Sequence, residues 1–588
     1  MIWQELCLQR RPQRAMHFLF ASAISLLLSG CGSWGSMSST AQTSASIPGQ
    51  VPLSCAQLAD VAVPAASIGL PTTGAVVSAA TPVAASGTGA TATGSYCKVM
   101  GSIKPVDPTA PSIHFQLDMP DSWNHKVMMF GGGGYDGAIP TPEGNVPIGP
   151  SNVATPLERG YAVFASDSGH QANALKSQDG SFGVNAEALR NFSGDALKKT
   201  RDAAIYLINA RYAVRGPARA YFAGGSSGGR EALAVAQRWP QDWDGVIVLY
   251  PAWAAASLDL QFGRITQAFA LPGAYMDPAK RLLLNRAVLA ACDGLDGVKD
   301  GVVSNVAACN ATFNPATATV DGSTTGAPLR CPNGADTGDT CLSDPQIAAL
   351  NVYNTPITFG YPLASGETQY PGFNVYGADL GESSTSAVEP IVTFLGLGKS
   401  QPASPMPNTA PYMSVFWDQW VRFIVTGDPS SNSLTLNPTK PGVWQSKISQ
   451  LTALQDVNST DLTAFNAKGG KILMAHGTAD VLVSTRSTEQ YYRRLQTTMG
   501  VLAVQNFVRY YEIPGMGHVV GTAFTPVWDS LTTLENWVEH GTTPPAQTIA
   551  DTAGVPGRTR PLCEYPTWPK YNGSGNVNAA SSFSCVTQ

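Results

Sequence analysis

The stretch Tyr-Phe-Ala-Gly-Gly-Ser-Ser-Gly-Gly-Arg, residues 221–230, contains a G-x-S-x-G pattern between an apolar segment and a segment of helical period. A strand that enters such a pattern and continues straight into a helix makes a sharp turn, which strains the serine backbone and exposes its hydroxyl beside the positive end of the helix. Glycines beside the serine avoid the clash that bulky side chains would cause there. The alternative is a simple Gly-Ser turn in a glycine-rich chain, but the flanking strand and helix favour the sharp turn and make Ser226 the candidate nucleophile.

Apolar segments alternate with helical ones on both sides of this turn. Helical period marks Leu197–Arg211 and Glu231–Arg238. This alternation predicts an α/β fold with a largely parallel sheet and helices on both faces. The expected strands are Lys126–Phe130, Tyr161–Ser166, Ala220–Ala223, Val246–Tyr250, Lys471–Ala475 and Phe507–Glu512.

The composition agrees with a folded protein that does not bind nucleic acid. Of the 588 residues, 44% are hydrophobic and 13% are charged, which excludes a charged, polar disordered chain. The 36 basic and 41 acidic residues give a net charge of −5, whereas non-specific nucleic-acid binding needs a basic surface.

The partners of the nucleophile must follow it, because the chain order in folds with this turn is serine, acid, histidine. Three histidines follow Ser226: His476, His518 and His540. His518 lies in the loop Pro-Gly-Met-Gly-His directly after a strand, where the base of a catalytic triad belongs. Asp480, after a His-Gly turn at another strand end, is the expected acid that orients the base. We expect His476 to support the turn at Asp480, and His540 to lie on a surface helix.

An oxyanion hole needs backbone N–H groups aimed at the developing charge. One should come from Ser227, directly after the nucleophile. The other should come from the run of four glycines at residues 131–134, after an early strand. Gly132 is the expected donor, with Gly131 or Gly133 as alternatives. A phosphate-binding loop is disfavoured, because no Lys-Ser/Thr follows and no GxGxxG opens a helix.

The chain has ten cysteines, of which Cys7 and Cys31 belong to the N-terminal export region. An even number of cysteines in an exported chain predicts disulfides rather than reduced thiols. Zinc is disfavoured, because no CxxC or HxxxH spacing occurs. Pairing by sequence neighbours predicts the disulfides Cys55–Cys97, Cys292–Cys309, Cys331–Cys341 and Cys563–Cys585.

The N-terminus has the features of an export signal. Three arginines precede the apolar run Phe18–Leu28, which is too short for a bilayer span of ~20 residues but fits a signal peptide. The run ends at Cys31 in a pattern like a bacterial lipobox, so residues 1–31 are expected to be a lipoprotein-type signal; an ordinary signal peptide with an incidental cysteine is the alternative. Residues 32–49 should form a flexible tether, and residues 62–95, rich in Ala, Thr and Gly, a poorly regular surface segment.

The acidic loop at residues 293–302 places three carboxylates in one turn-rich segment. Oxygen ligands at such spacing, with carbonyls between them, suit Ca²⁺, although the loop lacks the twelfth-position Glu of an EF-hand. The alternative is that Asp and Gly simply make turns. Cys292 and Cys309 flank the loop, which carries neither nucleophile nor base, so a bound ion would be structural.

Taken together, these segments resemble the tannase and feruloyl esterase family of α/β-hydrolases, and within it most closely the mono(2-hydroxyethyl) terephthalate hydrolase branch. The resemblance implies an α/β-hydrolase fold with a large inserted lid domain, and Ser226, Asp480 and His518 as the triad. It covers most of the chain after residue 50. The residues that carry it are Gly224–Arg230, Cys292–Val302, Gly469–Asp480, Pro514–His518 and Arg558–Cys563.

The resemblance also implies a structural Ca²⁺ and a domain order. The first part of the hydrolase core would span residues 50–251, the lid with the calcium loop 252–460, and the second part of the core 461–588. The implied calcium ligands are the carboxylates of Asp293, Asp296 and Asp300 and the carbonyls of Val298 and Val302.

This chain departs from the family pattern at three places. The family typically has a cysteine just before the nucleophile and another just after the histidine, joined as a disulfide. Gly225 and Val519 occupy those positions here. The carboxylate-binding arginine of the terephthalate branch has no clear counterpart around residues 395–425, where Arg422 is a candidate and an ordinary lid arginine is the alternative.

These features predict an exported serine esterase that cleaves esters of small aromatic acids, of feruloyl, galloyl or terephthaloyl type, through an acyl-enzyme. We expect no nucleic-acid partner, and a periplasmic, outer-membrane-anchored or secreted location in a bacterium, with a lipidated Cys31 as the membrane tether. The alternatives are an acyltransferase of the same fold and a non-catalytic surface-binding lipoprotein. Aromatic residues that could form the lid core or clasp an aromatic acyl group are Trp253, Phe262, Phe269, Tyr275, Tyr412, Phe416, Trp417, Trp420 and Phe423.

Overall fold

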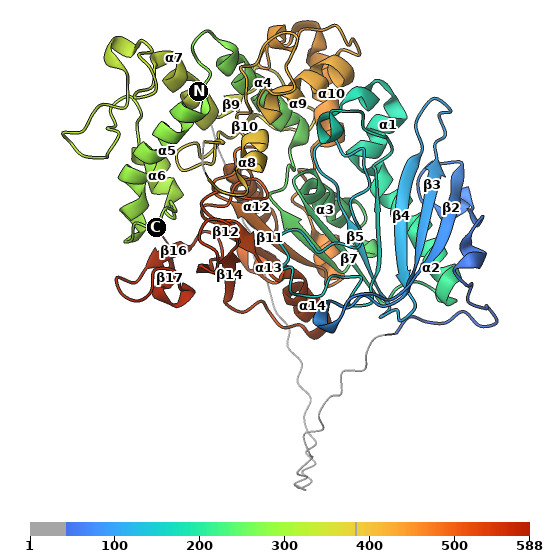
Figure 1. Cartoon of the computed structure of the whole chain (residues 1–588). Helices are drawn as coiled ribbons and strands as arrows, with labels where there is room; N and C mark the ends of the chain where they lie inside the picture. The colour runs from blue at the N-terminus through green and yellow to red at the C-terminus, as the bar shows by residue number, and fades with distance from the viewer. Residues whose placement is uncertain (1–42, 383–384, 588) are drawn as a thin grey trace, which may run out of the picture. The chain divides into compact units, whose positions relative to one another are not determined.

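The computed structural model describes residues 43–382 and 385–587. Its main element is a ten-stranded sheet in the order β1-β2-β3-β4-β6-β5-β7-β8-β11-β12, which Figure 1 shows with helices on both of its faces. The strands from β6 to β12 pair in parallel, whereas β1 to β4 and the β4–β6 pair are antiparallel. The bounds are β1 Ala62–Val63, β2 Gly74–Val83, β3 Tyr96–Lys104, β4 Ile113–Pro120, β5 Lys126–Phe130, β6 Ala162–Ser166, β7 Arg219–Gly225, β8 Gly245–Leu249, β11 Lys471–Gly477 and β12 Val508–Ile513.

The central strands are apolar along their whole length because both of their faces are buried. In β5, Val127 and Met129 point to one side and Met128 and Phe130 to the other, so each side joins a different hydrophobic cluster. Helices α2 and α3 cover the first face and α14 covers the second. The bounds of the helices are α1 Ala186–Arg190, α2 Ala196–Tyr212, α3 Ser227–Arg238, α4 Ala255–Ala270, α5 Pro278–Cys292, α6 Val306–Thr312, α7 Asp344–Asn354, α8 Glu389–Leu395, α9 Tyr412–Gln419, α10 Gln445–Gln455, α11 Thr463–Ala467, α12 Thr485–Met499, α13 Val501–Gln505 and α14 Ser530–His540.

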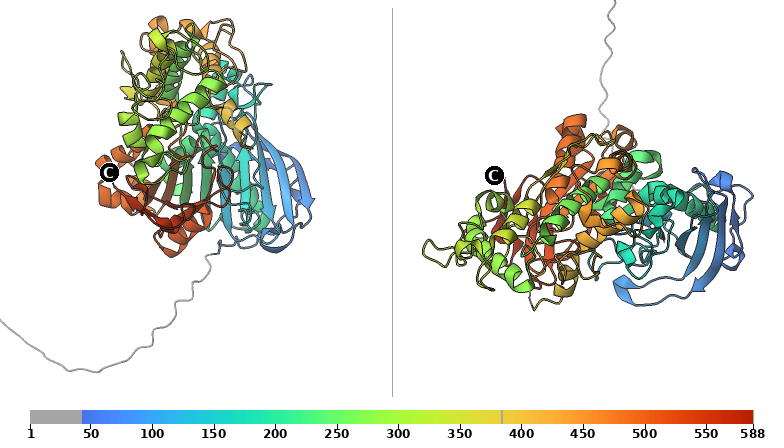
Figure 2. Two further views of the ribbon diagram at one scale, coloured as in Figure 1. Left: turned by 60° about the vertical axis from the view of Figure 1, so that its left-hand side comes forward. Right: turned by 90° about the horizontal axis from the view of Figure 1, so that it is seen from above.

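The chain leaves the sheet after β8 and returns at β11, which pairs directly with β8. The segment between them contains α4 to α11 and gathers largely at one end of the sheet (Figure 2), where a lid was expected. No helix within residues 43–382 and 385–587 is long and apolar enough to cross a bilayer. The remaining short strands are β9 Ile357–Thr358, β10 Gln369–Tyr370, β13 Pro526–Val527, β14 Gln547–Asp551, β15 Thr559–Leu562, β16 Trp568–Tyr571 and β17 Phe583–Val586.

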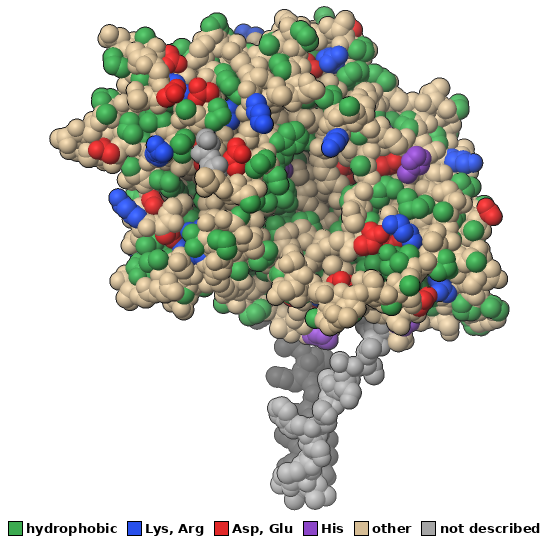
Figure 3. All heavy atoms as spheres, in the orientation of Figure 1, with side chains coloured by type: hydrophobic (Ala, Val, Ile, Leu, Met, Phe, Trp, Pro, Cys, Tyr) green, Lys and Arg blue, Asp and Glu red, His purple; other side chains and the backbone are tan. Residues whose placement is uncertain are grey.

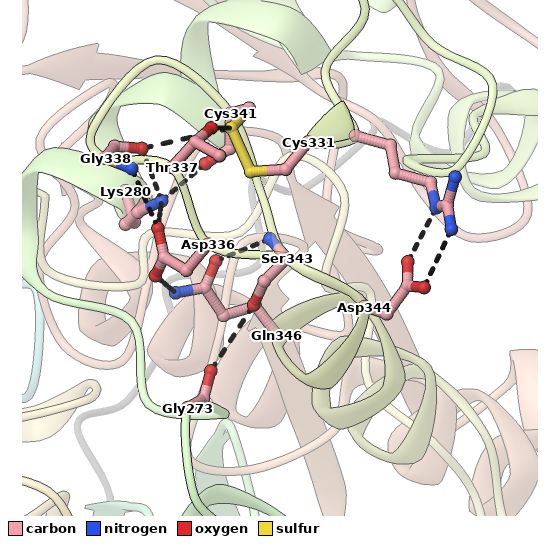
Figure 4. Close-up of a disulfide and its surroundings, with 11 residues drawn as sticks. Gly273, Lys280, Cys331, Asp336, Thr337, Gly338, Cys341, Ser343, Asp344 and Gln346 are labelled. Carbon is pink, nitrogen blue, oxygen red and sulfur yellow. Dashed lines mark hydrogen bonds and ion pairs between the residues drawn. A yellow bond between two sulfur atoms is a disulfide. The ribbon is translucent and has the colours of Figure 1, made fainter. Parts of the chain in front are cut away.

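All four predicted disulfides are present: Cys55–Cys97, Cys292–Cys309, Cys331–Cys341 and Cys563–Cys585. Figure 4 shows the third, which lies in an irregular part of the lid. There the buried ammonium of Lys280 donates to Asp336 Oδ1 at 2.8 Å and to the carbonyls of Gly338 and Cys341 at 2.7 and 2.6 Å. A cross-link and a buried cation together fix a loop that has almost no regular structure of its own.

Two expectations about the N-terminal part need correction. Residues 62–95 are not poorly regular throughout, because β2 pairs with β3 from Gly74 to Val83. Its small side chains lower the hydrophobic signal without weakening the backbone ladder. The predicted tether at residues 32–49 lies mostly outside the described residues, but its end is ordered: Ile47 N–H donates to Ala213 O at 2.9 Å. The predicted signal at residues 1–31, with Cys31, lies outside the described residues.

Candidate active site

The turn after β7 holds Ser226 in the strained conformation that the sequence predicts. Ser226 has φ 60° and ψ −124°, and α3 begins at the next residue. A positive φ costs a non-glycine residue free energy, which the surroundings must offset. A Cβ at Gly224 would overlap the backbone of Gly228, and one at Gly228 would come within 2.7 Å of Gly132 O. Both glycines are therefore required for this turn.

Three loops bring Ser226, His518 and Asp480 together. His518 Nε2 lies 3.0 Å from Ser226 Oγ, and His518 Nδ1 lies 2.8 Å from Asp480 Oδ2. The three residues follow β7, β12 and β11, whose carboxyl ends lie at one edge of the parallel sheet. This is the hydrogen-bond chain of a nucleophile, a base and an orienting acid.

The acid is fixed from several sides. Asp480 Oδ1 accepts from the N–H groups of Leu482 and Val483 at 2.7 and 2.9 Å. His476 Nε2 lies 3.2 Å from Asp480 Oδ2, in the supporting place expected of it. Burial alone would raise the pKa of Asp480, but His518 and His476 together hold it well below its usual value. Asp480 is therefore ionised at neutral pH and can stabilise a positive charge on His518.

The expected oxyanion-hole donors have different surroundings. Ser227 N–H, at the start of α3, has no hydrogen-bond partner in the described part of the chain. Gly132 was the expected second donor, but its N–H donates to Glu231 Oε2 at 2.9 Å and is unavailable to a substrate. Gly131 N–H is likewise used, since it donates to Ala223 O at 3.0 Å. Gly133 N–H, the other alternative, has no partner within residues 43–382 and 385–587 and stays a candidate donor.

An apolar pocket opens at Ser226. Helix α4 contributes Phe262 to its wall, and α9 contributes Tyr412 and Phe416. Two further rings, Tyr135 and Phe192, come from the first part of the chain and belong to no motif that the sequence analysis could recognise. Figure 3 shows that the face seen in Figure 1 is hollowed near its centre, with hydrophobic side chains along the hollow.

The other six aromatic candidates of the lid do not line this pocket. Trp417 and Trp420 are fully buried in the lid core, and their rings stack with 5.6 Å between centroids. Arg422 also lies elsewhere: its Nε donates to Pro429 O at 2.7 Å and its Nη1 pairs with Asp418 at 3.1 Å. Arg422 is therefore an ordinary lid arginine and does not line the pocket.

A larger cavity, of about 880 Å³, lies elsewhere in the described part of the chain. Its lining includes Arg486, Glu489 and Glu512 and none of the three triad residues. Burial and the charge of Glu489 raise the pKa of Glu512 to about 8. The aligned Ser-His-Asp set lies outside this cavity, so we assign the active site to the smaller pocket at Ser226.

The acidic loop offers oxygen donors of the kind that Ca²⁺ binds. Asp296 is fully buried, its Oδ2 has no hydrogen-bond partner in the described part of the chain, and burial with the neighbouring acids raises its pKa to about 6. The carbonyls of Val298 and Val302 also accept no hydrogen bond from the described residues. These open acceptors fit a hard cation.

Other contacts in the loop limit this fit. Asp300 forms an ion pair with Arg560, and Asp293 accepts from the N–H groups of Asp300 and Gly301 at 3.2 and 3.1 Å. Within residues 43–382 and 385–587, no three or more His, Cys, Asp or Glu side chains are grouped as a metal site would need. A cation at this loop would therefore need the carbonyls as well as the carboxylates, and it would compete with Arg560 for Asp300.

Comparisons with known proteins agree with this geometry. The family "Tannase and feruloyl esterase" matches residues 97–586. An uncharacterized esterase of Agrobacterium fabrum is 36% identical over 539 residues, covering 90% of this chain and 93% of that protein. Mono(2-hydroxyethyl) terephthalate hydrolase of Piscinibacter sakaiensis is 32% identical over 534 residues, covering 84% and 85%. The crystal structure of feruloyl esterase B from Aspergillus oryzae has the same fold, with a TM-score of 0.69, 20% identity, and coverage of 91% of this chain and 100% of that one. The chain therefore belongs to the tannase and feruloyl esterase family and is a carboxylic ester hydrolase with the α/β-hydrolase fold.

Proposed function

We propose that this protein hydrolyses esters of small aromatic acids through an acyl-enzyme formed on Ser226. The observation that carries the proposal is the pocket itself, in which the nucleophile of an aligned Ser-His-Asp set faces five aromatic rings. The aromatic side chains that line the pocket favour an aromatic acyl group, because aromatic rings stack or pack edge to face. Two relatives act on such compounds by name, a terephthalate ester hydrolase and a probable feruloyl esterase.

The proposed reaction has two halves. Ser226 Oγ attacks the acyl carbonyl carbon while its proton passes to His518 Nε2, and Asp480 stabilises the resulting imidazolium. The oxygen that becomes negative accepts from the N–H groups of Ser227 and Gly133. The ester C–O bond then breaks, the alcohol leaves with the proton from His518, and the acyl group stays on Ser226. Water repeats the attack with His518 as base, which releases the acid and restores the serine.

A hydrolysis panel tests this proposal. Methyl gallate, methyl ferulate and mono(2-hydroxyethyl) terephthalate are incubated with the wild type and with Ser226→Ala, without added alcohol. We expect free acid from at least one ester with the wild type and none above background with the variant. Product that forms only when an alcohol is added would instead establish an acyltransferase, and hydrolysis of acetyl esters alone would contradict an aromatic substrate.

We also propose a structural calcium ion at the acidic loop. The carboxylates of Asp293, Asp296 and Asp300 and the carbonyls of Val298 and Val302 would hold it. Its support is the set of open oxygen acceptors around the buried Asp296. When bound, the ion would stabilise the fold, and no proton or acyl group passes through it.

The four disulfides are those of an exported protein, because such bonds persist in oxidising compartments. Beyond export, we propose that the mature chain is anchored in a bacterial envelope through a lipidated Cys31. The support is the sequence alone: an apolar run followed by small residues before the cysteine. Metabolic labelling with a fatty-acid analogue, compared between the wild type and Cys31→Ser, tests this proposal.

A further inference from the structure

Helix α4 places an acid on the face that lines the active-site pocket. Ala255, Leu258, Asp259 and Phe262 all line the pocket with Ser226, and their spacing puts them on one side of the helix. Asp259 is 3% exposed. Its Oδ1 is buried without a hydrogen-bond partner in the described part of the chain, and the carboxylate forms no ion pair there. An acid on an otherwise apolar stripe is not explained by the packing of the helix.

The other polar side chains of the pocket all have partners within the protein. Asp259 therefore differs from the other polar side chains of the pocket, and a buried polar group without a hydrogen-bond partner is unfavourable. The satisfied contacts are Ser226 to His518 (3.0 Å), Ser227 Oγ to Gly134 O (2.7 Å), Tyr135 OH to Phe416 O (3.1 Å), Tyr412 OH to Ser177 O (3.2 Å) and Trp420 Nε1 to Gln455 Oε1 (3.3 Å).

No cation balances this acid at close range. The charge of Arg230 acts on Asp259, but that guanidinium donates to Phe192 O at 2.9 Å and lies over the Phe192 ring, 4.6 Å from its centre. Burial, reinforced by Asp456, holds the pKa of Asp259 well above its usual range. A carboxyl with a raised pKa keeps its proton to higher pH, and the protonated form can both donate and accept a hydrogen bond.

We propose that the Asp259 carboxyl hydrogen-bonds a hydroxyl group on the aromatic ring of the acyl moiety, and so selects hydroxylated aromatic acids over those with a second carboxylate. A phenolic hydroxyl also donates and accepts, so it matches this carboxyl in either protonation state. A carboxylate would bring a negative charge beside Asp259 in a pocket lined by no Lys or Arg. Asp259 is thus a specificity-determining residue, and this inference rests on the proposed esterase function of the pocket.

Two methyl esters that differ by one hydroxyl test the proposal, namely methyl 4-hydroxycinnamate and methyl cinnamate, with monomethyl terephthalate as the third substrate. A site built to bind a hydroxyl discriminates strongly against analogues that lack it, so we expect the wild type to favour the hydroxylated ester by about 10- to 100-fold in kcat/KM. Monomethyl terephthalate should be the poorest of the three. In Asp259→Leu the preference for the hydroxyl should fall below threefold. Asp259→Asn, which keeps a donor and an acceptor, should retain most of it.

Arg422→Gln is the control, because Arg422 lies in the lid and does not line the pocket, and it should keep the wild-type ratio. A wild type without the preference, or a preference that survives in Asp259→Leu, would overturn the inference while leaving the esterase function intact. Absence of hydrolysis with both cinnamate esters, monomethyl terephthalate and methyl gallate would overturn the proposed function, and the inference with it. If Asp259→Leu does not fold, competitive inhibition of the wild type decides: 4-hydroxycinnamate should bind more tightly than cinnamate and terephthalate, and equal inhibition constants would contradict the role of Asp259.

Discussion

The segments joined by disulfides and the loops that carry the triad are held in place by different means. Each disulfide joins cysteines 10 to 42 residues apart. Ser226 and His518 are 292 residues apart, and no disulfide in the described part of the chain joins their loops. The triad loops instead follow parallel strands whose backbone hydrogen bonds fix where each loop begins. Disulfides thus join segments that are close in sequence, and the parallel sheet holds the distant catalytic loops together.

A tyrosine ring lies beside Gly225, one of the two positions where the family pattern implies a cysteine. A Cβ at Gly225 would lie 2.5 Å from the ring of Tyr250, so this ring fills the space beside the turn. The same ring meets His518 edge-on, with 4.9 Å between centroids. Val519 occupies the other position where the family pattern implies a cysteine. It is half-exposed and has φ 70°, which is strained for a β-branched residue. The Tyr250 ring therefore lies next to both the turn at Gly225 and the ring of His518.

The largest effect is expected from removing a triad residue. Ser226→Ala should fold normally and lose about 10⁴- to 10⁶-fold in kcat, because triad residues act as a unit. His518→Ala should be nearly as damaging. His540→Ala, a change at the exposed end of α14, should leave turnover within about twofold of the wild type, as surface changes usually have small effects. Near-normal turnover by Ser226→Ala would mean that another residue is the nucleophile.

The triad could be predicted from sequence because each member follows a strand within a short local pattern. The four glycines at residues 131–134, by contrast, offered no local basis for choosing a donor. The choice depends on Glu231, which lies on α3 and takes the N–H of Gly132. That contact exists only once the loop and the helix are packed together.

Several residues that line the pocket could not be predicted from the sequence either. Tyr135, Phe192 and Asp259 come from separate segments and share no spacing, so only the fold brings them to Ser226. The strand Gly74–Val83 was missed for a different reason. Its small Ala and Thr side chains weakened the apolar signal, while its backbone pairs with the next strand from Gly74 to Val83, with one irregularity between Val77 and Ala79.

A medium effect is expected at Tyr250. Tyr250→Ala should lower kcat by about 10- to 100-fold with a smaller change in KM, because a small displacement of the base weakens transition-state contacts. Tyr250→Phe keeps the ring and should retain most of the activity. The pair of variants separates packing from the hydroxyl. Equal loss in both would show that the hydroxyl matters, and no loss in either would show that the ring does not position His518.

A smaller effect, on stability alone, is expected from the acidic loop inside Cys292–Cys309. A cation present at about 100 times its Kd adds about 2.7 kcal/mol of unfolding free energy, so EGTA should lower Tm while turnover at modest temperature stays near that of the untreated enzyme. Calcium, but not magnesium, should restore Tm. Asp296→Asn should lower the Tm of the calcium-loaded enzyme and abolish its response to EGTA. An unchanged Tm after confirmed removal of calcium would reject the ion.

The smallest effect, on stability, is expected from engineering a disulfide between positions 225 and 519. Gly225→Cys with Val519→Cys should fail to form a disulfide in the wild-type background, because the ring of Tyr250 occupies the space that a side chain at position 225 needs. With Tyr250→Ala added, that space opens and the two cysteines should join. The gain should be about 1 kcal/mol, less than a long closed loop promises in theory, because the loops around it are already held by the sheet. Mass spectrometry of the oxidised variants, with melting curves with and without reductant, measures both quantities. If the triple variant also recovers part of the kcat lost in Tyr250→Ala, then the ring and the disulfide are alternative ways to hold His518 against Ser226. Two free thiols in a folded triple variant would instead mean that positions 225 and 519 are too far apart for a disulfide. Tyr250 would then position His518 without linking the two loops.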